Sequence, residues 1–589
     1  MKTRYDNMKS RWGRRAAKAA CLGMALLCAS CLDFEPEAQM NDASVWSNAT
    51  NFQLFANQFY SWTSDFQSGE STSYRARVND GPHSDMRSDI LCGPNENLYS
   101  DGTNSIPEED GNYNNLYKQI YYTNLLLQRA QGFEPQEDIA VPVAEAKFFR
   151  AYCYFELVQL YGDCILLTEP ADMDSPAMNA ERNDRGEVID QCIKDLQEAA
   201  EGLPDRPSEA GRLCKDAAYA YLSRVALYEG TWQKFHTGGA GATDNSERVT
   251  SLLTTARDAA DEVISRGNYS LFYNSQLGTE SYRYMFILED AQCNPAGLTT
   301  SDNTEYIFSR RHRLEDGIGY NITHAYIVNG VYALRKLANL YVCQDGLPID
   351  KSPLFNGYNT PTSEYDNRDN RMLTTLAKRG TMVWDNSVNN SRVAWNDDDL
   401  TRAKEVGNSN SGYQTHKWAV ERLVNDNMEA MDFPIIRYAE VLLNYAEAAY
   451  ELNNSISDAD LDKSLNLVRL RVNPDMTKLS NALVDANGLS MREEIRRERT
   501  VELAFEGFRI DDLKRWATAE TEMPQDQLGV KWSGTQFETL WANQSRPLNS
   551  EGCIIMYTDR RWSERNYLYP LPSDQTQLNP NIGQNPGWE

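Results

Sequence analysis

The chain has 589 residues, of which 41% are apolar and 11% aromatic, and its formal net charge is −27 at pH 7. This is a globular composition with more aromatic rings, including 32 Tyr and 12 Trp, than a core requires, so some rings are expected at a binding surface. A surface this acidic repels phosphate groups, which argues against nucleic acid and anionic lipid heads as partners.

The first thirty residues have the pattern of a secretory signal. Basic side chains precede a short apolar run, Ala19–Ala29, which is too short to span a membrane. Cys31 follows small residues, as in the bacterial lipobox, where the thiol is acylated and becomes the first mature residue; Cys28 stands where an aliphatic residue is usual. We expect residues 1–30 to be a lipoprotein signal peptide, Cys31 to be lipidated and 31–48 to form a tether. Ordinary cleavage between Ala29 and Ser30 is the alternative.

The stretch Ala144–Tyr161 predicts the central helix of the molecule. It contains no Gly or Pro and carries apolar residues on two sides, as expected for a helix packed between neighbours. Gly162 predicts its end. The polar residues of this helix are expected to face water: Lys147, Arg150, Glu156 and Gln159.

Other segments with helical patterns precede and follow this helix. They are Asn48–Ser64, Tyr113–Ala130, Arg185–Gly202, Arg212–Glu229 (ended by Gly230), Ser246–Arg266, Tyr332–Leu340, Ile435–Leu452, Asp460–Arg471 and Leu489–Trp516. The stretch Gln67–Gly111 is expected to be irregular, as are the insertion 268–432 and the C-terminal segment 517–589. Helical repeats at about 112–266 and 433–516 predict one mainly α domain, 49–589, in which a tetratricopeptide-like helical-hairpin solenoid carries long irregular loops.

Eight cysteines follow Cys31, and none forms a CxxC pair. In a chain of this size they are expected to be buried small hydrophobic residues and not a disulfide framework.

Seven segments in this order, the first of which begins at the lipobox cysteine, resemble the SusD/RagB family of outer-membrane nutrient-binding lipoproteins. They are Cys31–Pro36, Ala144–Asp163, Asp345–Ile349, Asn367–Met372 (Asn370 replaces a frequent Pro), the late helical stretches 433–451 and 495–516, and the closing segment 567–588. The resemblance implies a SusD-like α-α superhelix, anchored by lipid and facing the exterior of a Gram-negative outer membrane. It also implies a SusC-like TonB-dependent transporter as partner and a glycan as the usual cargo, with peptides as a variation. It implies no cofactor.

Catalysis has one candidate in the sequence. Glu498, Glu502 and Glu506 are spaced i, i+4, i+8, and two carboxyl groups at such spacing could serve a glycosidase. Arginines alternate with them at positions 496, 497, 499 and 509, which predicts a ladder of helix ion pairs that keeps the carboxylates ionised. The protein is therefore expected not to be an enzyme, and no metal-ligand spacing is present.

Sugar binding requires aromatic rings against the C–H face of a pyranose and polar groups for its hydroxyls. Two loop regions, 74–104 and 282–320, combine rings with Asn and Arg. The candidate ligand-binding residues are Tyr74, Arg75, Asn95, Asn97, Tyr99, Tyr282, Tyr284, His312, Arg313 and Tyr320.

The sequence thus predicts a surface lipoprotein that captures oligosaccharides and passes them to a SusC-like transporter, with an affinity nearly independent of salt. The alternatives are a peptide- or protein-binding member of the same family, a surface glycoside hydrolase, and a structural lid that contacts no cargo.

Overall fold

The computed structural model describes residues 46–66, 82–172, 174–236, 246–317, 319, 322–323, 331–379, 381–386, 391–394, 411–420, 428–540, 542 and 545–589. The chain divides into two compact units, 1–54 and 55–589. In the first unit the rings of Trp46 and Phe52 lie 4.9 Å apart. Helix α3 (Ala49–Ala56) crosses the boundary and continues as a 3₁₀ turn, Asn57–Trp62. The second unit contains everything that follows.

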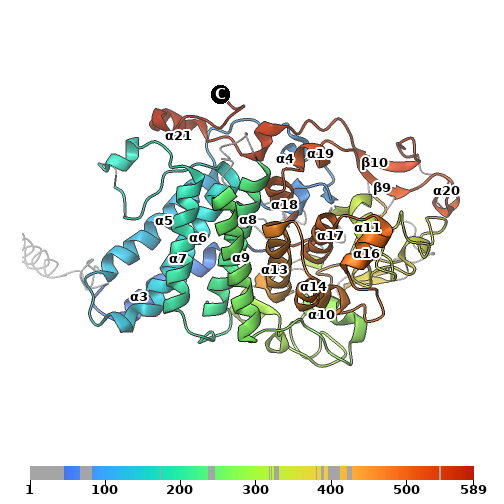
Figure 1. Ribbon diagram of the computed structural model, residues 1–589, viewed down its shortest axis with the longest axis horizontal. Helices are drawn as coiled ribbons and strands as arrows, with labels where there is room; N and C mark the ends of the chain where they lie inside the picture. Colours follow the sequence, from blue (N-terminus) through green and yellow to red (C-terminus); the bar gives the residue numbers. More distant parts are fainter. Residues whose placement is uncertain are drawn as a thin grey trace, which may run out of the picture. The chain divides into compact units, whose positions relative to one another are not determined.

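Long helices form the scaffold of the second unit and confirm the predicted mainly α fold. They are α5 (Gly111–Ala130), α6 (Ala140–Tyr161), α7 (Arg185–Gly202), α8 (Lys215–Phe235), α9 (Ser246–Arg266), α13 (Tyr438–Asn453) and α17 (Met491–Leu503). Each helix from α5 to α9 packs on the next, α9 packs on α13, and α13 on α17, as Figure 1 shows. This succession of neighbouring helices is the helical stack that the sequence predicts.

Shorter helices fill in the rest of the unit. They are α4 (Leu98–Asp101), α10 (Ser281–Met285), α11 (Arg335–Leu340), α12 (Arg371–Thr375), α14 (Asp458–Lys463), α15 (Leu465–Leu470), α16 (Asn481–Asn487), α18 (Arg509–Arg515), α19 (Ala519–Glu522), α20 (Gln536–Leu540) and α21 (Ser573–Leu578). None of the helices in the described part of the chain combines the length and apolarity that crossing a bilayer requires.

Helix α6 is buried along almost its whole length, between α5 and α7. Its rings also reach α8, since Tyr152 stacks on Tyr221 at 5.6 Å and Phe155 meets Tyr228 edge-on at 5.3 Å. The expectation that its polar residues face water is wrong for two of them. Arg150 is buried and binds Asp195 through two nitrogens, at 2.6 and 2.8 Å, and Gln159 is only 8% exposed.

Several predicted helix bounds differ from the structure. The predicted helix Asp460–Arg471 is two helices, α14 and α15, and two other differences have a clear physical cause. Helix α8 continues through Gly230 to Phe235. The glycine does not end the helix and instead serves packing: a Cβ at position 230 would lie 3.0 Å from Leu253, so its absence lets α8 and α9 approach closely. The predicted helix Leu489–Trp516 is two helices, α17 and α18. Between them Phe505 and Gly507 adopt positive φ angles of 67° and 84°, which no helix accommodates.

Strands appear where the sequence predicts irregular chain or helix. The insertion and the loop before α4 share a sheet in the order β1 (Leu91–Cys92), β3 (Tyr332–Ala333), β7 (Gln414–Thr415) and β4 (Leu376–Ala377). Strand β2 (Tyr306–Arg310) pairs antiparallel with β8 (Phe433–Arg437), which directly precedes α13. Two further antiparallel pairs are β5 (Met382–Asn386) with β6 (Ser391–Ala394) and β9 (Gln527–Lys531) with β10 (Cys553–Tyr557).

The eight cysteines after Cys31 are all buried and none is in a disulfide, which confirms their predicted role as small core residues.

Candidate functional site

A cavity of about 770 Å³ lies among α5, α6, α8, α18, strand β8 and the chain segments 61–65 and 82–84. This volume is in the range of ligand pockets in proteins. We call it the aromatic cavity because rings contribute much of its wall: Trp62, Tyr152, Phe155, Tyr221, Tyr228, Phe433 and Phe508. Polar side chains are interspersed among these rings, so the wall offers both apolar faces and hydrogen-bonding groups.

Helical spacing places the wall residues. Tyr152, Phe155, Glu156 and Gln159 follow one another at i, i+3, i+4 and i+7, and therefore lie on one face of α6. On α8, the wall residues 221, 224, 227 and 228 likewise share one face. Helices α6 and α8 thus each contribute a row of residues to the aromatic cavity.

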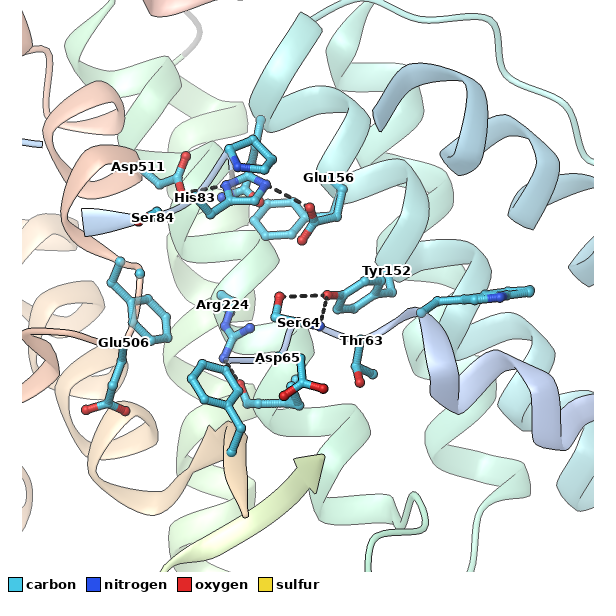
Figure 2. A pocket seen from close by; sticks show the side chains of 18 of the residues that line it. Thr63, Ser64, Asp65, His83, Ser84, Tyr152, Glu156, Arg224, Glu506 and Asp511 are labelled. Carbon is cyan, nitrogen blue, oxygen red and sulfur yellow. Dashed lines mark hydrogen bonds and ion pairs between the residues drawn. The ribbon is translucent and has the colours of Figure 1, made fainter. Parts of the chain in front are cut away.

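The segment Ser61–Asp65 contributes to the wall beside α6. The backbone N–H of Ser64 donates to the hydroxyl of Tyr152 at 3.2 Å, and the two side-chain hydroxyls are also 3.2 Å apart (Figure 2). This contact orients the Tyr152 ring at the wall.

An imidazole held between two carboxylates forms another part of the wall (Figure 2). Nε2 of His83 lies 2.7 Å from Glu156 on α6, and Nδ1 lies 2.7 Å from Asp511 on α18. We call these three residues the histidine clamp. Burial disfavours the imidazolium, but Glu156 and Asp511 outweigh this effect and raise the pKa of His83 to about 10. His83 is therefore charged at neutral pH, and the clamp sets two carboxyl groups against one cation.

The structure places the sequence-predicted ligand residues in several different environments. Tyr282 is fully buried, and its hydroxyl donates to the backbone carbonyl of Glu502 at 2.7 Å. Tyr284 and His312 are buried as well, with His312 bound to the carbonyl of Met431 at 2.8 Å. Their side chains are not accessible to a ligand in this conformation. Arg313 is exposed and lies 3.5 Å from Glu315.

The remaining predicted ligand residues that the structure describes do not line the aromatic cavity. Asn95 is exposed, and Asn97 caps α4 by accepting from the N–H groups of Tyr99 and Ser100. Tyr99 packs on Tyr569 at 4.8 Å and beneath the guanidinium of Arg87 at 3.8 Å. Tyr74, Arg75, Tyr320 and Cys31 lie outside the described residues.

The two predicted loop regions do reach the aromatic cavity, but through other residues. Pro82, His83 and Ser84 from the first region line it, as do Arg310 and Gly317 from the second. The sequence does not single out the wall residues of α6 and α8, because rings on a helix face usually belong to the core. The sequence signal for this face is Glu156, a charged residue among the buried residues of the same helix face.

The predicted ladder of helix ion pairs is wrong for the three glutamates, although Arg496 and Arg497 pair along α17 with Glu493 and Glu494. Glu506 lies beyond the end of α17, and the partners of the three glutamates come from other elements. Glu498 binds Arg371 and Arg469, Glu502 binds Arg371, Arg437 and Arg471, and Glu506 binds Lys417 and Arg437.

This network decides whether these carboxylates could act as a general acid. Burial alone would raise the pKa of Glu502, but Arg471, Arg437 and Arg371 outweigh it and hold the pKa well below its usual range. The pKa of Glu506 is lowered too, because Arg437 and Lys417 outweigh its burial. A glycosidase acid needs the opposite shift, so Glu502 and Glu506 do not fit that role. Within the described residues, no group of three or more His, Cys, Asp or Glu could hold a metal ion.

Comparisons with known proteins identify the family. Residues 300–588 match the model of the SusD family, and residues 32–227 match a model described as "Starch-binding associating with outer membrane". The two matches together cover most of the chain, which belongs to the SusD/RagB family.

Particular relatives agree with this family. SusD-like protein P38 of Formosa agariphila is 24% identical over 513 residues, which are 84% of this chain and 89% of that protein. SusD-like protein P25 of the same organism is 32% identical over 125 residues, which are 20% of this chain and only 24% of that protein. A SusD-like carbohydrate-binding protein of Bacteroides fragilis shares the fold, with a TM-score of 0.70 at 23% identity, covering 92% of this chain and all of that one.

Proposed function

We propose that this protein binds a glycan in the aromatic cavity. The observation that carries the proposal is the composition of the wall, in which rings from α6, α8 and the segment before residue 66 alternate with hydrogen-bonding groups. Rings cover the C–H faces of a sugar while polar groups take its hydroxyls. The solved relative described as carbohydrate-binding supports the same class of ligand.

The proposal extends to the place of the protein in the cell. We propose that Cys31 carries a lipid that anchors the protein to the exterior of the outer membrane, and that the captured oligosaccharide passes to a SusC-like TonB-dependent transporter. The match to a family described as associating with the outer membrane supports this arrangement. Replacing Cys31 by Ala should release the protein from the membrane fraction, and the transporter should copurify with the wild-type protein from native membranes.

Trp62→Ala tests the cavity directly. Trp62 is half-buried and lines the cavity, so the variant removes a ring surface and should weaken oligosaccharide binding by roughly tenfold. Binding of residues 32–589 is first found on a glycan array and then measured by calorimetry, with circular dichroism to confirm folding.

Two variants make this test specific. Tyr273→Ala, at a ring that is 57% exposed and outside the cavity, should bind like the wild type. Tyr99→Ala tests the predicted loop region. A loss of affinity in Tyr99→Ala with none in Trp62→Ala would move the site from the cavity to that loop. The absence of any glycan ligand on the array would contradict the proposed function itself.

A further inference from the structure

The ion pairs in the wall of the aromatic cavity limit the charge that its ligand can carry. Every arginine among the described wall residues already has a carboxylate partner. The pairs are Arg224 with Glu440 at 2.6 Å, Arg310 with Asp65 at 3.4 Å, Arg499 with Asp512 at 2.9 Å and Arg515 with Glu447 at 2.5 Å. Each guanidinium charge is thus balanced inside the protein, and no described wall arginine is left to neutralise an anion brought by a ligand.

The histidine clamp differs from these pairs because it holds two carboxylates for one cation. The side chains of Glu156 and His83 are 17% and 18% exposed, against 10% for Asp511, so the clamp is open to the cavity mainly at these two residues. One carboxylate oxygen of Glu156, Oε2, contacts His83, while no hydrogen bond to its other oxygen, Oε1, is found among the described residues. Asp511 also has one oxygen, Oδ1, without a hydrogen-bond partner in the described part of the chain, but this atom is buried. Glu156, the more exposed of the two acidic residues, therefore presents the negative side of the clamp to the cavity.

This arrangement penalises one class of sugar. A carboxylate or sulfate entering the cavity would lose its hydration without meeting an unpaired cation among the wall residues that the structure describes, and it would be repelled by Glu156. A hydroxyl group meets no such penalty, because it can donate to a carboxylate oxygen and accept from the N–H groups at the wall.

We propose that Glu156 is a specificity-determining residue, which restricts the cavity to glycans without acidic groups and excludes uronate- and sulfate-bearing ones. This inference rests on the proposed function, because it assigns the ligand class of the same cavity.

The test compares matched oligosaccharides. A neutral oligosaccharide found on the array is measured by calorimetry beside its C6-oxidised uronate and its 6-O-sulfate, at the same chain length and linkage. The wild-type protein should bind each acidic form at least tenfold more weakly than the neutral one. In Glu156→Gln the ratio of neutral to acidic affinity should fall at least threefold, while Glu156→Asp, which keeps the charge, should retain the ratio.

The net negative charge of the whole chain could also repel acidic sugars, and two controls separate this effect. Glu137→Gln removes the same charge at an exposed position outside the cavity and should leave the ratio unchanged. A penalty that came from distant surface charge would disappear at 0.5 M salt, where the screening length is only about 4 Å, whereas a penalty at the cavity wall should persist.

Equal binding of neutral and acidic forms by the wild type would overturn the inference and leave glycan binding intact. An unchanged ratio of neutral to acidic affinity in Glu156→Gln would also overturn it. If no glycan of any charge binds, the proposed function fails, and this inference fails with it.

Discussion

Buried acidic side chains in this protein take different charge states because their neighbours differ. Asp89 is buried, yet Arg509 and Lys336 outweigh the desolvation and hold its pKa far below the usual range. Asp85 is buried without a direct cation partner, and burial raises its pKa to about 7 although three backbone N–H groups donate to it. Burial likewise raises the pKa of Glu429 to about 8. A nearby cation, and not burial alone, keeps an interior carboxyl group ionised.

Glu429→Gln should change how stability depends on pH. In the folded protein Glu429 has a pKa of about 8, whereas in the unfolded chain it is expected near the reference value of about 4.3. Between these values the folded state binds more protons, so the Glu429 contribution to the free energy of unfolding falls as the pH rises. Glutamine does not titrate. The stability of the wild type relative to the variant should therefore fall from pH 5 to pH 8, by at most about 1.4 kcal/mol per unit.

Urea unfolding of both proteins at pH 5, 6, 7 and 8 measures this difference. Glu137→Gln, the same substitution at an exposed position, should show no pH-dependent difference from the wild type. A constant difference between the wild type and Glu429→Gln across this range would contradict the assigned charge state.

At the scale of elements, the break between α17 and α18 is held by a residue far away in the sequence. Asp85 accepts hydrogen bonds from the backbone N–H groups of Phe505 at 2.8 Å, Gly507 at 3.3 Å and Arg509 at 3.0 Å. These groups would otherwise be buried donors without partners at the start of a helix. The break brings α18, with Asp511, to the wall of the aromatic cavity.

Gly507→Ala should destabilise the protein more than an alanine at another left-handed glycine. Gly507 has φ +84°, and a Cβ there would lie 2.8 Å from the carbonyl oxygen of His83. Gly488 has φ +60° with open space around it, so Gly488→Ala measures the backbone strain alone, about 1 kcal/mol. We expect Gly507→Ala to exceed this control by at least about 1 kcal/mol in urea unfolding. Equal losses would show that the close approach to His83 adds nothing.

Some elements follow from local sequence and others do not. Helices α7 and α9 have the predicted bounds, because each has an amphipathic pattern with a clear end signal; Asp184 caps the start of α7 and Gly267 follows α9 at φ +62°. Strand β8 was predicted as the start of a helix, since a short apolar run does not distinguish the two. This segment is a strand because it pairs with β2, which lies more than a hundred residues earlier in the sequence.

The site was less predictable than the fold for a related reason. Ring-rich loops were a reasonable signal for sugar binding, but a tyrosine in a loop can be buried, as Tyr282 is, and a tyrosine on a helix can line a cavity, as Tyr152 does. Which of these occurs depends on how distant segments pack, and one sequence does not contain that information. The charge at Glu156 marks the cavity side of α6, whereas the sequence pattern alone predicts a residue that faces water.

Across the whole second unit, a buried charge network joins segments that are far apart in the sequence. Arg437 on β8 donates to Glu305 at 2.8 Å, to Glu502 at 2.7 Å and to both oxygens of Glu506 at 2.7 Å. It thereby links the β2–β8 pair to α17 and to the break that follows it. Charges removed from water in this way depend on complete pairing.

Arg437→Met should lower the free energy of unfolding by about 3 kcal/mol or more, because it leaves several buried carboxylates short of a partner. Arg257→Met is the control: Arg257 is 36% exposed and pairs at 2.7 Å with Asp258, which is 60% exposed, so its loss should cost about 1 kcal/mol or less. Urea unfolding compares the two. Similar losses would indicate that the network contributes little to the stability of the unit.

The buried thiols give the chain an intrinsic indicator of its own unfolding. In the stretch 32–589 the eight cysteines are the only thiols, and burial raises the pKa of each one, so the reactive thiolate is scarce in the native protein. An alkylating reagent consequently labels molecules that have opened and spares those that have not. Mass spectrometry of the modified cysteines would then resolve which region loosens first, from α6 at Cys153 to β10 at Cys553, without any added probe.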